Sequence, residues 1–269
     1  YKRQMQPTPR ATELEAGLSS ILGDITQLVS GSRFDPASFK GEVALALSEY
    51  IGVALLPPLM QRLQHLAPHL TIRVITRVEN QLEELSRGNL DFAVHIKQQF
   101  YSRDFRLEPL GRSPPAILVR DGHPLTTDKT SRPELARFPL IRLYVSDWEQ
   151  AEIQRHTKAG SHIHDHPRGA LEISHLLTAL EILRDSDYFM PAPAYILQNE
   201  AATRGIAALP VPEGDYYELD YVLVAHTRTA NSAMHNWLWR QITSTIGELR
   251  TPATRKIRQR LMAGSGDAT

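Results

Sequence analysis

Three short apolar segments decide the fold of this chain: EVALAL (42–47), TIRVIT (71–76) and LDFAVH (90–95). Their length, their β-branched residues and their polar boundaries are typical of β-strands. Residues 49–66 and 79–87 lie between them and repeat apolar side chains with the helical period, and Gly88 suits the end of the second helix. This βαβαβ order predicts a parallel sheet with right-handed crossover connections.

The rest of the chain predicts a second alternating set of elements. Residues 105–120 favour two strands interrupted at Pro114-Pro115, and the turn-forming stretch 121–124 marks the expected end of the first lobe. Further strands are expected at residues 138–144, 170–174, 188–191, 206–209 and 217–226. Further helices are expected at residues 147–158, 175–184, 194–202 and 231–249. The predicted fold class is therefore α/β, with two lobes.

The composition excludes several classes of protein. The chain has 269 residues, enough for a sizeable core, and no cysteine, so it forms no disulfide and no cysteine-based metal site. Lys and Arg together number 30, as do Asp and Glu, so no net charge draws the chain toward nucleic acid. No apolar run reaches the roughly 18–20 residues that a membrane-spanning helix needs.

An amphipathic helix is predicted before the first strand, over residues 8–30. Thr8 can serve as its N-cap, Pro9 suits the first helical position, and Gly31 suits its end. Its apolar residues follow the coiled-coil spacing of four and three: Leu14, Leu18, Ile21, Ile25 and Leu28. The pattern favours dimerisation through this helix, and packing against its own domain is the alternative.

Several local motifs, in order along the chain, carry a resemblance to a known family. They are MQPTPRA (5–11), LALSEY (45–50), Leu56-Pro57, Ala67-Pro68, LSRGNLDFAV (85–94) and GHPL (122–125). The set resembles LysR-type transcriptional regulators over residues 1–250, without the family's N-terminal winged helix-turn-helix domain. One departure is Asp185-Ser186-Asp187, which stands where the family usually has a glycine-rich turn.

The resemblance implies two Rossmann-like subdomains, similar to periplasmic binding proteins and joined by two crossover strands. The implied division is a remnant of the DNA-binding wing (1–10), a linker helix for dimerisation (11–31), subdomain I (39–121 and 226–249) and subdomain II (122–225). A disordered tail (250–269) is expected from its basic and then Gly/Ser-rich composition. The resemblance also implies a cytoplasmic homodimer or homotetramer that binds a small effector between the subdomains. DNA is expected to be reached only through an N-terminal domain missing from this sequence.

A periplasmic solute-binding protein shares the implied fold and is the alternative. The predicted helix over residues 8–30 has no role in such a protein, and the first residues carry no apolar signal-peptide core.

Candidate effector contacts follow from a rule for open α/β sheets, whose ligands bind beyond the carboxyl ends of strands and near helix N-termini. These positions are Ser48, Glu49, Tyr50, Thr76, Arg77 and His95 in the first lobe, and Arg142, Tyr144, Ser174 and His175 in the second. Ser48 can bind a ligand at a helix N-terminus that favours anions, and plain capping is the alternative. Arg77 can hold a carboxylate in bidentate fashion or form a surface ion pair with Glu79 or Glu83. For His95 the structural alternative is favoured, because a lone histidine at a strand end is more often a structural residue.

Motifs for other chemistry are absent. The sequence has no G-x-S-x-G elbow, no G-x-G-x-x-G loop and no P-loop, so no enzymatic activity and no cofactor are expected. His162, His164 and His166 could share one side of an extended loop and hold a metal ion. Because no second cluster of ligands accompanies them, a solvated loop is favoured and no metal site is expected.

Overall fold

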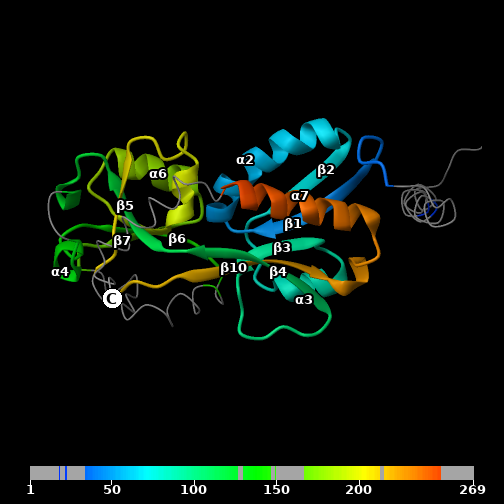
Figure 1. Cartoon of the computed structure of the whole chain (residues 1–269). Helices are drawn as coiled ribbons and strands as arrows, with labels where there is room; N and C mark the ends of the chain where they lie inside the picture. Colours follow the sequence, from blue (N-terminus) through cyan, green and yellow to red (C-terminus); the bar gives the residue numbers. More distant parts are fainter. Residues whose placement is uncertain are drawn as a thin grey trace, which may run out of the picture.

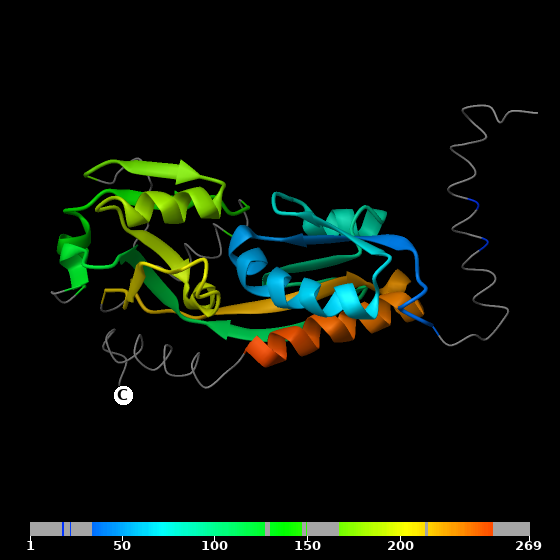
Figure 2. The ribbon, with the colours of Figure 1, turned by 90° about the horizontal axis from the view of Figure 1, so that it is seen from above.

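The predicted groups of strands and helices form two lobes that lie side by side and are joined by extended strands (Figure 1). A computed structural model of the chain describes residues 34–126, 130–146, 149, 167–212 and 215–249, together with Leu18 and Leu22. Figure 2 shows that the long axis of the molecule runs through both lobes, with the connecting strands between them.

One five-stranded sheet forms the centre of the first lobe, in the order β2-β1-β3-β10-β4. Its strands are β1 (Gly41–Leu47), β2 (Leu70–Ile75), β3 (Phe92–Ile96), β4 (Phe105–Ser113) and β10 (Leu219–His226). The first three pair in parallel, as the βαβαβ order predicts, whereas β10 is antiparallel to both β3 and β4. A late segment of the chain therefore lies inside the sheet that the early segments begin.

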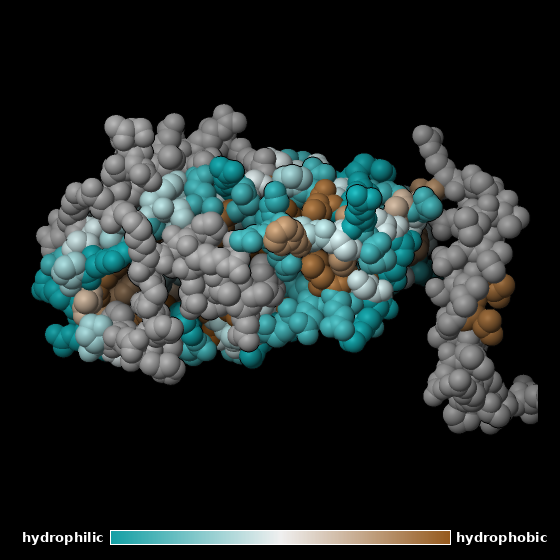
Figure 3. Space-filling view, turned by 90° about the horizontal axis from the view of Figure 1, so that it is seen from below, coloured by the Kyte–Doolittle hydropathy of each residue, from teal (hydrophilic) through white to brown (hydrophobic). Residues whose placement is uncertain are grey.

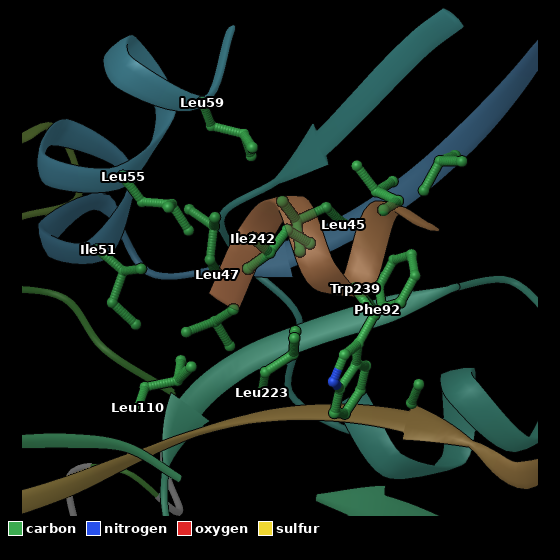
Figure 4. Packing of buried hydrophobic residues seen from close by; sticks show 14 of the residues in the cluster. Leu45, Leu47, Ile51, Leu55, Leu59, Phe92, Leu110, Leu223, Trp239 and Ile242 are labelled. Atoms are coloured by element: carbon green, nitrogen blue, oxygen red, sulfur yellow. The ribbon is translucent and has the colours of Figure 1, made fainter. Parts of the chain in front are cut away.

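Helices cover both faces of this sheet. The long helices α2 (Glu49–Leu66) and α7 (Ala233–Leu249) pack on one face, and the short helix α3 (Gln81–Arg87) packs on the other. Helix α2 forms its apolar side by placing Ile51, Leu55, Leu59 and Leu63 at intervals of four residues. Figure 4 shows three of these side chains, Ile51, Leu55 and Leu59, pointing toward side chains of the sheet and of α7.

Pro57, one of two prolines inside α2, makes a contact between the lobes possible. Pro57 has no N–H, so the carbonyl of Val53, four residues earlier, loses its helical partner. The side-chain amide of Asn199, in the second lobe, donates a hydrogen bond of 2.8 Å to that carbonyl. The irregularity in the helix thus provides an acceptor for the neighbouring lobe.

The second lobe divides its strands between two smaller sheets. In the first, β5 (Pro115–Arg120) lies between β8 (Met190–Pro193) and β9 (Ile206–Leu209), and both neighbours are antiparallel to it. In the second, β6 (Leu140–Leu143) pairs in parallel with β7 (Ala170–Ile173), and a bridge between Leu140 and Phe189 links the two sheets. Helix α6 (Leu176–Arg184) packs on them.

Short helical turns complete the described part of this lobe and its junction to α7. They are η1 (Pro124–Thr126), α4 (Arg132–Leu135), η3 (Ala194–Gln198) and η4 (Thr227–Thr229).

The structure confirms the α/β fold with two lobes and corrects some of its details. The helix expected over residues 194–202 is a 3-10 helix of five residues, after which Asn199 turns back to accept the N–H of Ala202. The expected strands at 138–144 and 217–226 begin later, at Leu140 and Leu219. The helix expected over 8–30, the helix expected over 147–158 and the tail 250–269 lie outside the described residues, apart from Leu18, Leu22 and Glu149.

The sheets also bear on where one lobe ends and the next begins. β5 belongs to a sheet of the second lobe, although residues up to 121 were expected in the first, and β10 belongs to the sheet of the first lobe. We therefore propose lobe boundaries at Pro114, between β4 and β5, and between β9 and β10. β4 ends at Ser113 and β5 begins at Pro115, and Pro114 between them has no N–H to donate to a strand ladder.

Candidate functional site

A cavity of about 340 Å³ lies where the two lobes and the connecting strands meet. The first lobe contributes Ser48, Tyr50 and Ile96, which stand at the N-terminus of α2 and at the end of β3. The connecting segments contribute Ser113, Pro114, Pro115, Tyr217, Leu219 and Tyr221. The second lobe supplies the remaining wall, so the cavity is formed by both lobes together.

The walls are mainly apolar, with a few polar groups. Ile117, Leu135, Leu140, Phe189 and Val211 provide much of the apolar surface, and all five are buried. Cavities of this size and composition are typical of sites for small organic ligands, because apolar walls contribute affinity and scattered polar groups fix orientation. The outer surface differs, since the described part of the face in Figure 3 is mostly hydrophilic.

Ser48 and Tyr50 form the wall on the side of the first lobe. Ser48 is the N-cap residue of α2 in an extended conformation, and its side chain makes no capping hydrogen bond. Its hydroxyl and the first N–H groups of the helix can therefore bind a ligand. The Tyr50 hydroxyl donates a 3.0 Å hydrogen bond to the Pro191 carbonyl in the second lobe. Burial, together with Tyr217, raises the pKa of Tyr50, so its phenol stays neutral.

Two arginines face the cavity from the second lobe, and each is paired with a carboxylate. Arg132 Nε donates to Asp215 at 2.9 Å, and its second contact makes the pair bidentate. Arg142 Nε donates to Glu172 on the neighbouring strand at 2.9 Å. Asp215 is only 8% exposed, which makes its pairing with Arg132 costly to break.

Glu149 is a buried carboxyl group in the same cavity. Only 4% of the residue is exposed. Its Oε2 accepts a hydrogen bond of 3.1 Å from the Ser146 hydroxyl, and its Oε1 accepts a weak one of 3.5 Å from the N–H of Ile96 in the first lobe. Burial raises the pKa of Glu149 to about 6, and the nearby Glu79 adds to this rise.

Three of the ten predicted contacts line the cavity: Ser48, Tyr50 and Arg142. Glu49, Thr76, Ser174 and His175 stand at strand ends or helix starts as expected, but they do not line it. His95 points into the core of the first lobe, where it is fully buried beside the Tyr101 ring, and burial lowers its pKa to about 4. The structural alternative thus describes its position.

Arg77 and Tyr144 meet each other rather than the cavity. The Arg77 guanidinium lies 4.4 Å from the centroid of the Tyr144 ring, a cation–π contact between the two lobes. The Tyr144 hydroxyl donates a hydrogen bond to Glu79, which is also in the first lobe. We call these three residues the interlobe clasp. Two strand ends predicted as ligand contacts therefore contact each other across the two lobes and do not line this cavity.

Glu149, Arg132 and Asp215 line the cavity but were missed by the sequence reasoning. Arg132 begins the short helix α4, Glu149 is a helical residue within the segment expected as a helix (147–158), and Asp215 lies between β9 and β10. None of them stands at the carboxyl end of a predicted strand. The described residues contain no group of three or more potential metal ligands, and His162, His164 and His166 lie outside them. Among the helices of the described residues, none combines the length and hydropathy that crossing a membrane requires.

Comparison with known proteins decides the family. The family model described as "LysR substrate binding domain" matches residues 36–246, which is most of the chain. The chain belongs to the LysR substrate-binding domain family. Its two lobes and the cavity between them are thus the regulatory domain of a LysR-type transcriptional regulator.

Similar proteins agree with this assignment. The HTH-type transcriptional regulator SyrM of Rhizobium meliloti is 26% identical over 246 residues, covering 86% of this chain and 69% of SyrM. The HTH-type transcriptional activator NahR of Pseudomonas putida is 25% identical, covering 77% and 69%. A crystal structure of a probable transcriptional regulator from Pseudomonas aeruginosa superimposes with a TM-score of 0.64 and 23% identity, covering 90% and 80%. These relatives are regulators, and the solute-binding alternative is not favoured.

Proposed function

We propose that the cavity binds a small-molecule effector and that its occupancy changes the relative orientation of the two lobes. The observation that carries this proposal is the composition of the walls: Ser48 and Ile96 come from one lobe, Arg142 and Glu149 from the other. A ligand that touches both lobes favours the arrangement in which all its contacts are made. A coupling of roughly 1–3 kcal/mol between such a site and DNA binding is typical of allosteric proteins.

The contacts between the lobes give this change a physical basis. The hydrogen bonds from Tyr50 to Pro191 and from Asn199 to Val53, and the interlobe clasp, all join the two lobes in the arrangement described above. An effector competes with or supplements these contacts, because it shares the same space between the lobes. A small difference in binding energy is therefore enough to change which arrangement predominates.

A variant that fills the cavity tests this proposal. Val145 lines the cavity and is half-buried, so Val145→Trp occupies ligand space, whereas Leu177→Trp adds the same bulk to an exposed position of α6. A library of small organic compounds is screened for thermal stabilisation of the unaltered chain, and hits are titrated by calorimetry. Hits should bind the Leu177→Trp control and lose at least tenfold in affinity for Val145→Trp. Equal affinity for both variants would place the ligand elsewhere.

We also propose that the regulator acts as a cytoplasmic homodimer or homotetramer assembled through the linker helix. The support is the seam Leu14, Leu18, Ile21, Ile25 and Leu28, of which Leu18 is described as helical and 53% exposed. Light scattering should show fewer copies per assembly for Leu18→Asp than for the unaltered chain. The chain that begins at Phe34 should show the same loss. Leu177→Asp, at a leucine that is 67% exposed, should leave the mass unchanged. An unchanged number of copies per assembly in Leu18→Asp and in the chain that begins at Phe34 would exclude this seam as the interface.

A further inference from the structure

The charged side chains that line the cavity differ in whether they are paired with a group of opposite charge. Among the described residues, four charged side chains line it: Arg132, Arg142, Glu149 and Asp215. Each arginine is hydrogen-bonded to a carboxylate, Arg132 to Asp215 and Arg142 to Glu172. Within the described part of the chain, no cation contacts Glu149. Once the paired groups cancel, this carboxyl group is the charge that the described residues present to a ligand.

Glu149 also stands where an anionic ligand would be expected. It comes from the second lobe but reaches the N–H of Ile96, at the carboxyl end of β3. β3 pairs with β1, whose carboxyl end leads to Ser48 and the N-terminus of α2. The strand ends and helix N-terminus that usually attract an anion therefore already have a carboxyl group of the chain beside them.

We infer that Glu149 makes this cavity selective for effectors without a negative charge, which present a hydroxyl or amine donor to its carboxyl group and an apolar body to the other walls. This inference rests on the proposed binding of an effector in the cavity. A ligand carboxylate would face Glu149 in a poorly hydrated space, where like charges repel strongly. A donor instead supplies the hydrogen bond that Ile96, at 3.5 Å, gives only weakly.

The surroundings of Glu149 predict how this selectivity depends on pH. Glu79 faces it from the first lobe, Tyr195 from η3 and Tyr221 from β10, while Arg132 and Arg142 are engaged elsewhere. Burial and Glu79 both favour the protonated form, with a pKa of about 6. Glu149 is therefore mostly ionised at pH 7.5 and mostly protonated at pH 5.5, so discrimination against anions should weaken as the pH falls.

Three matched probes test the inference on the full chain: 2-naphthol, 2-naphthylmethylamine and 2-naphthoate. They share one apolar body and differ in the group presented to Glu149. Calorimetric titration at pH 7.5 should show 2-naphthol or the amine binding at least tenfold more tightly than 2-naphthoate. Glu149→Gln should reduce this ratio at least fivefold, and the exposed control Glu200→Gln should leave it unchanged.

A second measurement keeps the test independent of how well Glu149→Gln folds. In the unaltered chain the ratio of 2-naphthol to 2-naphthoate affinity should fall at least threefold between pH 7.5 and pH 5.5. Two outcomes would overturn the inference: tight binding of 2-naphthoate at pH 7.5, or an affinity ratio that changes neither with pH nor in Glu149→Gln. The proposal that the cavity binds an effector would still stand in either case. Binding of none of the three probes would contradict the proposed function itself, and the inference with it.

Discussion

The two lobes build their sides of the cavity in different ways. The first lobe has one continuous sheet with parallel strands at its centre, and it contributes residues from a strand end and a helix start, Ile96, Ser48 and Tyr50. The second lobe divides its strands between two small sheets, and only one of its charged lining residues, Arg142, comes from a strand. Arg132 comes from a short helix, Glu149 is a helical residue and Asp215 lies between two strands. The strand-end rule therefore locates Ser48 and Tyr50 in the cavity wall of the first lobe and Arg142 in that of the second, but it does not locate the other charged residues of the second lobe.

The largest expected effect compares two buried phenylalanines, one from each lobe. Phe92 is 1% exposed in the core of the first lobe, whereas Phe189 is 4% exposed but borders the cavity. Phe92→Ala should lower the free energy of unfolding by about 3–5 kcal/mol. Phe189→Ala should cost less, because part of its surface already lacks packed neighbours. Urea denaturation measures both, and Phe100→Ala, at 84% exposure, should change little.

If Phe189→Ala proves as costly as Phe92→Ala, the cavity wall is packed as tightly as the core. The interpretation that Phe189 borders open space while Phe92 is packed on all sides would then be wrong.

The next largest effect is the contribution of His95, in the first lobe, to the loss of folding stability at low pH. Burial lowers the pKa of His95 to about 4, whereas an unfolded histidine titrates near 6.5. Between these values the unfolded chain binds a proton that the folded chain does not, so His95 lowers stability as the pH falls. The loss should approach about 3 kcal/mol near pH 4. His95→Gln should flatten this part of the stability profile in denaturant titrations at several pH values.

The exposed His69 provides the matched control. His69→Gln should retain the full acid-dependent loss. The same loss in His95→Gln and in the unaltered chain would mean that other groups cause it.

A smaller effect tests the contact that Pro57 makes possible between the lobes. Asn199→Ala leaves the Val53 carbonyl without its 2.8 Å partner and should cost about 1–3 kcal/mol. In a Pro57→Ala background the helix regains an N–H for that carbonyl, so the same substitution should cost less. Unfolding free energies of the four proteins form a double-mutant cycle. Strictly additive costs would contradict the role given to Pro57.

The smallest effect concerns the interlobe clasp. Tyr144→Phe keeps the ring under Arg77 but removes the hydrogen bond to Glu79, a loss of under about 1 kcal/mol at a partly exposed site. The expected result is a larger population of open arrangements with little change in stability. Because the chain has no cysteine, spin labels can be attached through Met60→Cys in the first lobe and Leu177→Cys in the second.

Distance distributions between these labels should shift to longer values in Tyr144→Phe. Tyr188→Phe, in the same lobe, should leave them as they are. Unchanged distances in both would show that the clasp does not restrain the lobes.

Most of the fold could be predicted because its elements carry strong local signals. Residues 49–66 were expected to form a helix and do so, even with Pro57 and Pro58 inside, because their apolar side chains keep the helical spacing. The first three strands were placed to within two residues, since each is a short apolar run bounded by polar residues. The 3-10 turn at Ala194–Gln198 was expected as a longer helix because its apolar residues resemble helical ones.

The site could be predicted only in part. Ser48 follows directly from the strand before it and the helix after it, so the sequence locates it. Glu149 and Asp215 approach the cavity only because separate segments fold back on each other, and nothing in their immediate sequence indicates this. Arg77 and Tyr144 were rightly placed at strand ends, but their mutual contact depends on the relative position of the lobes.

The place of β10 in the first sheet constrains the order in which the chain can fold. β10 pairs with β3 on one side and with β4 on the other, yet it begins at Leu219, more than a hundred residues after β4 ends. During synthesis, the first lobe therefore cannot complete its sheet until nearly the whole second lobe has left the ribosome. Until then β3 and β4 each have an edge without its partner strand, and such edges are prone to wrong pairing. Rapid folding of the inserted second lobe shortens the time for which these edges stay unpaired.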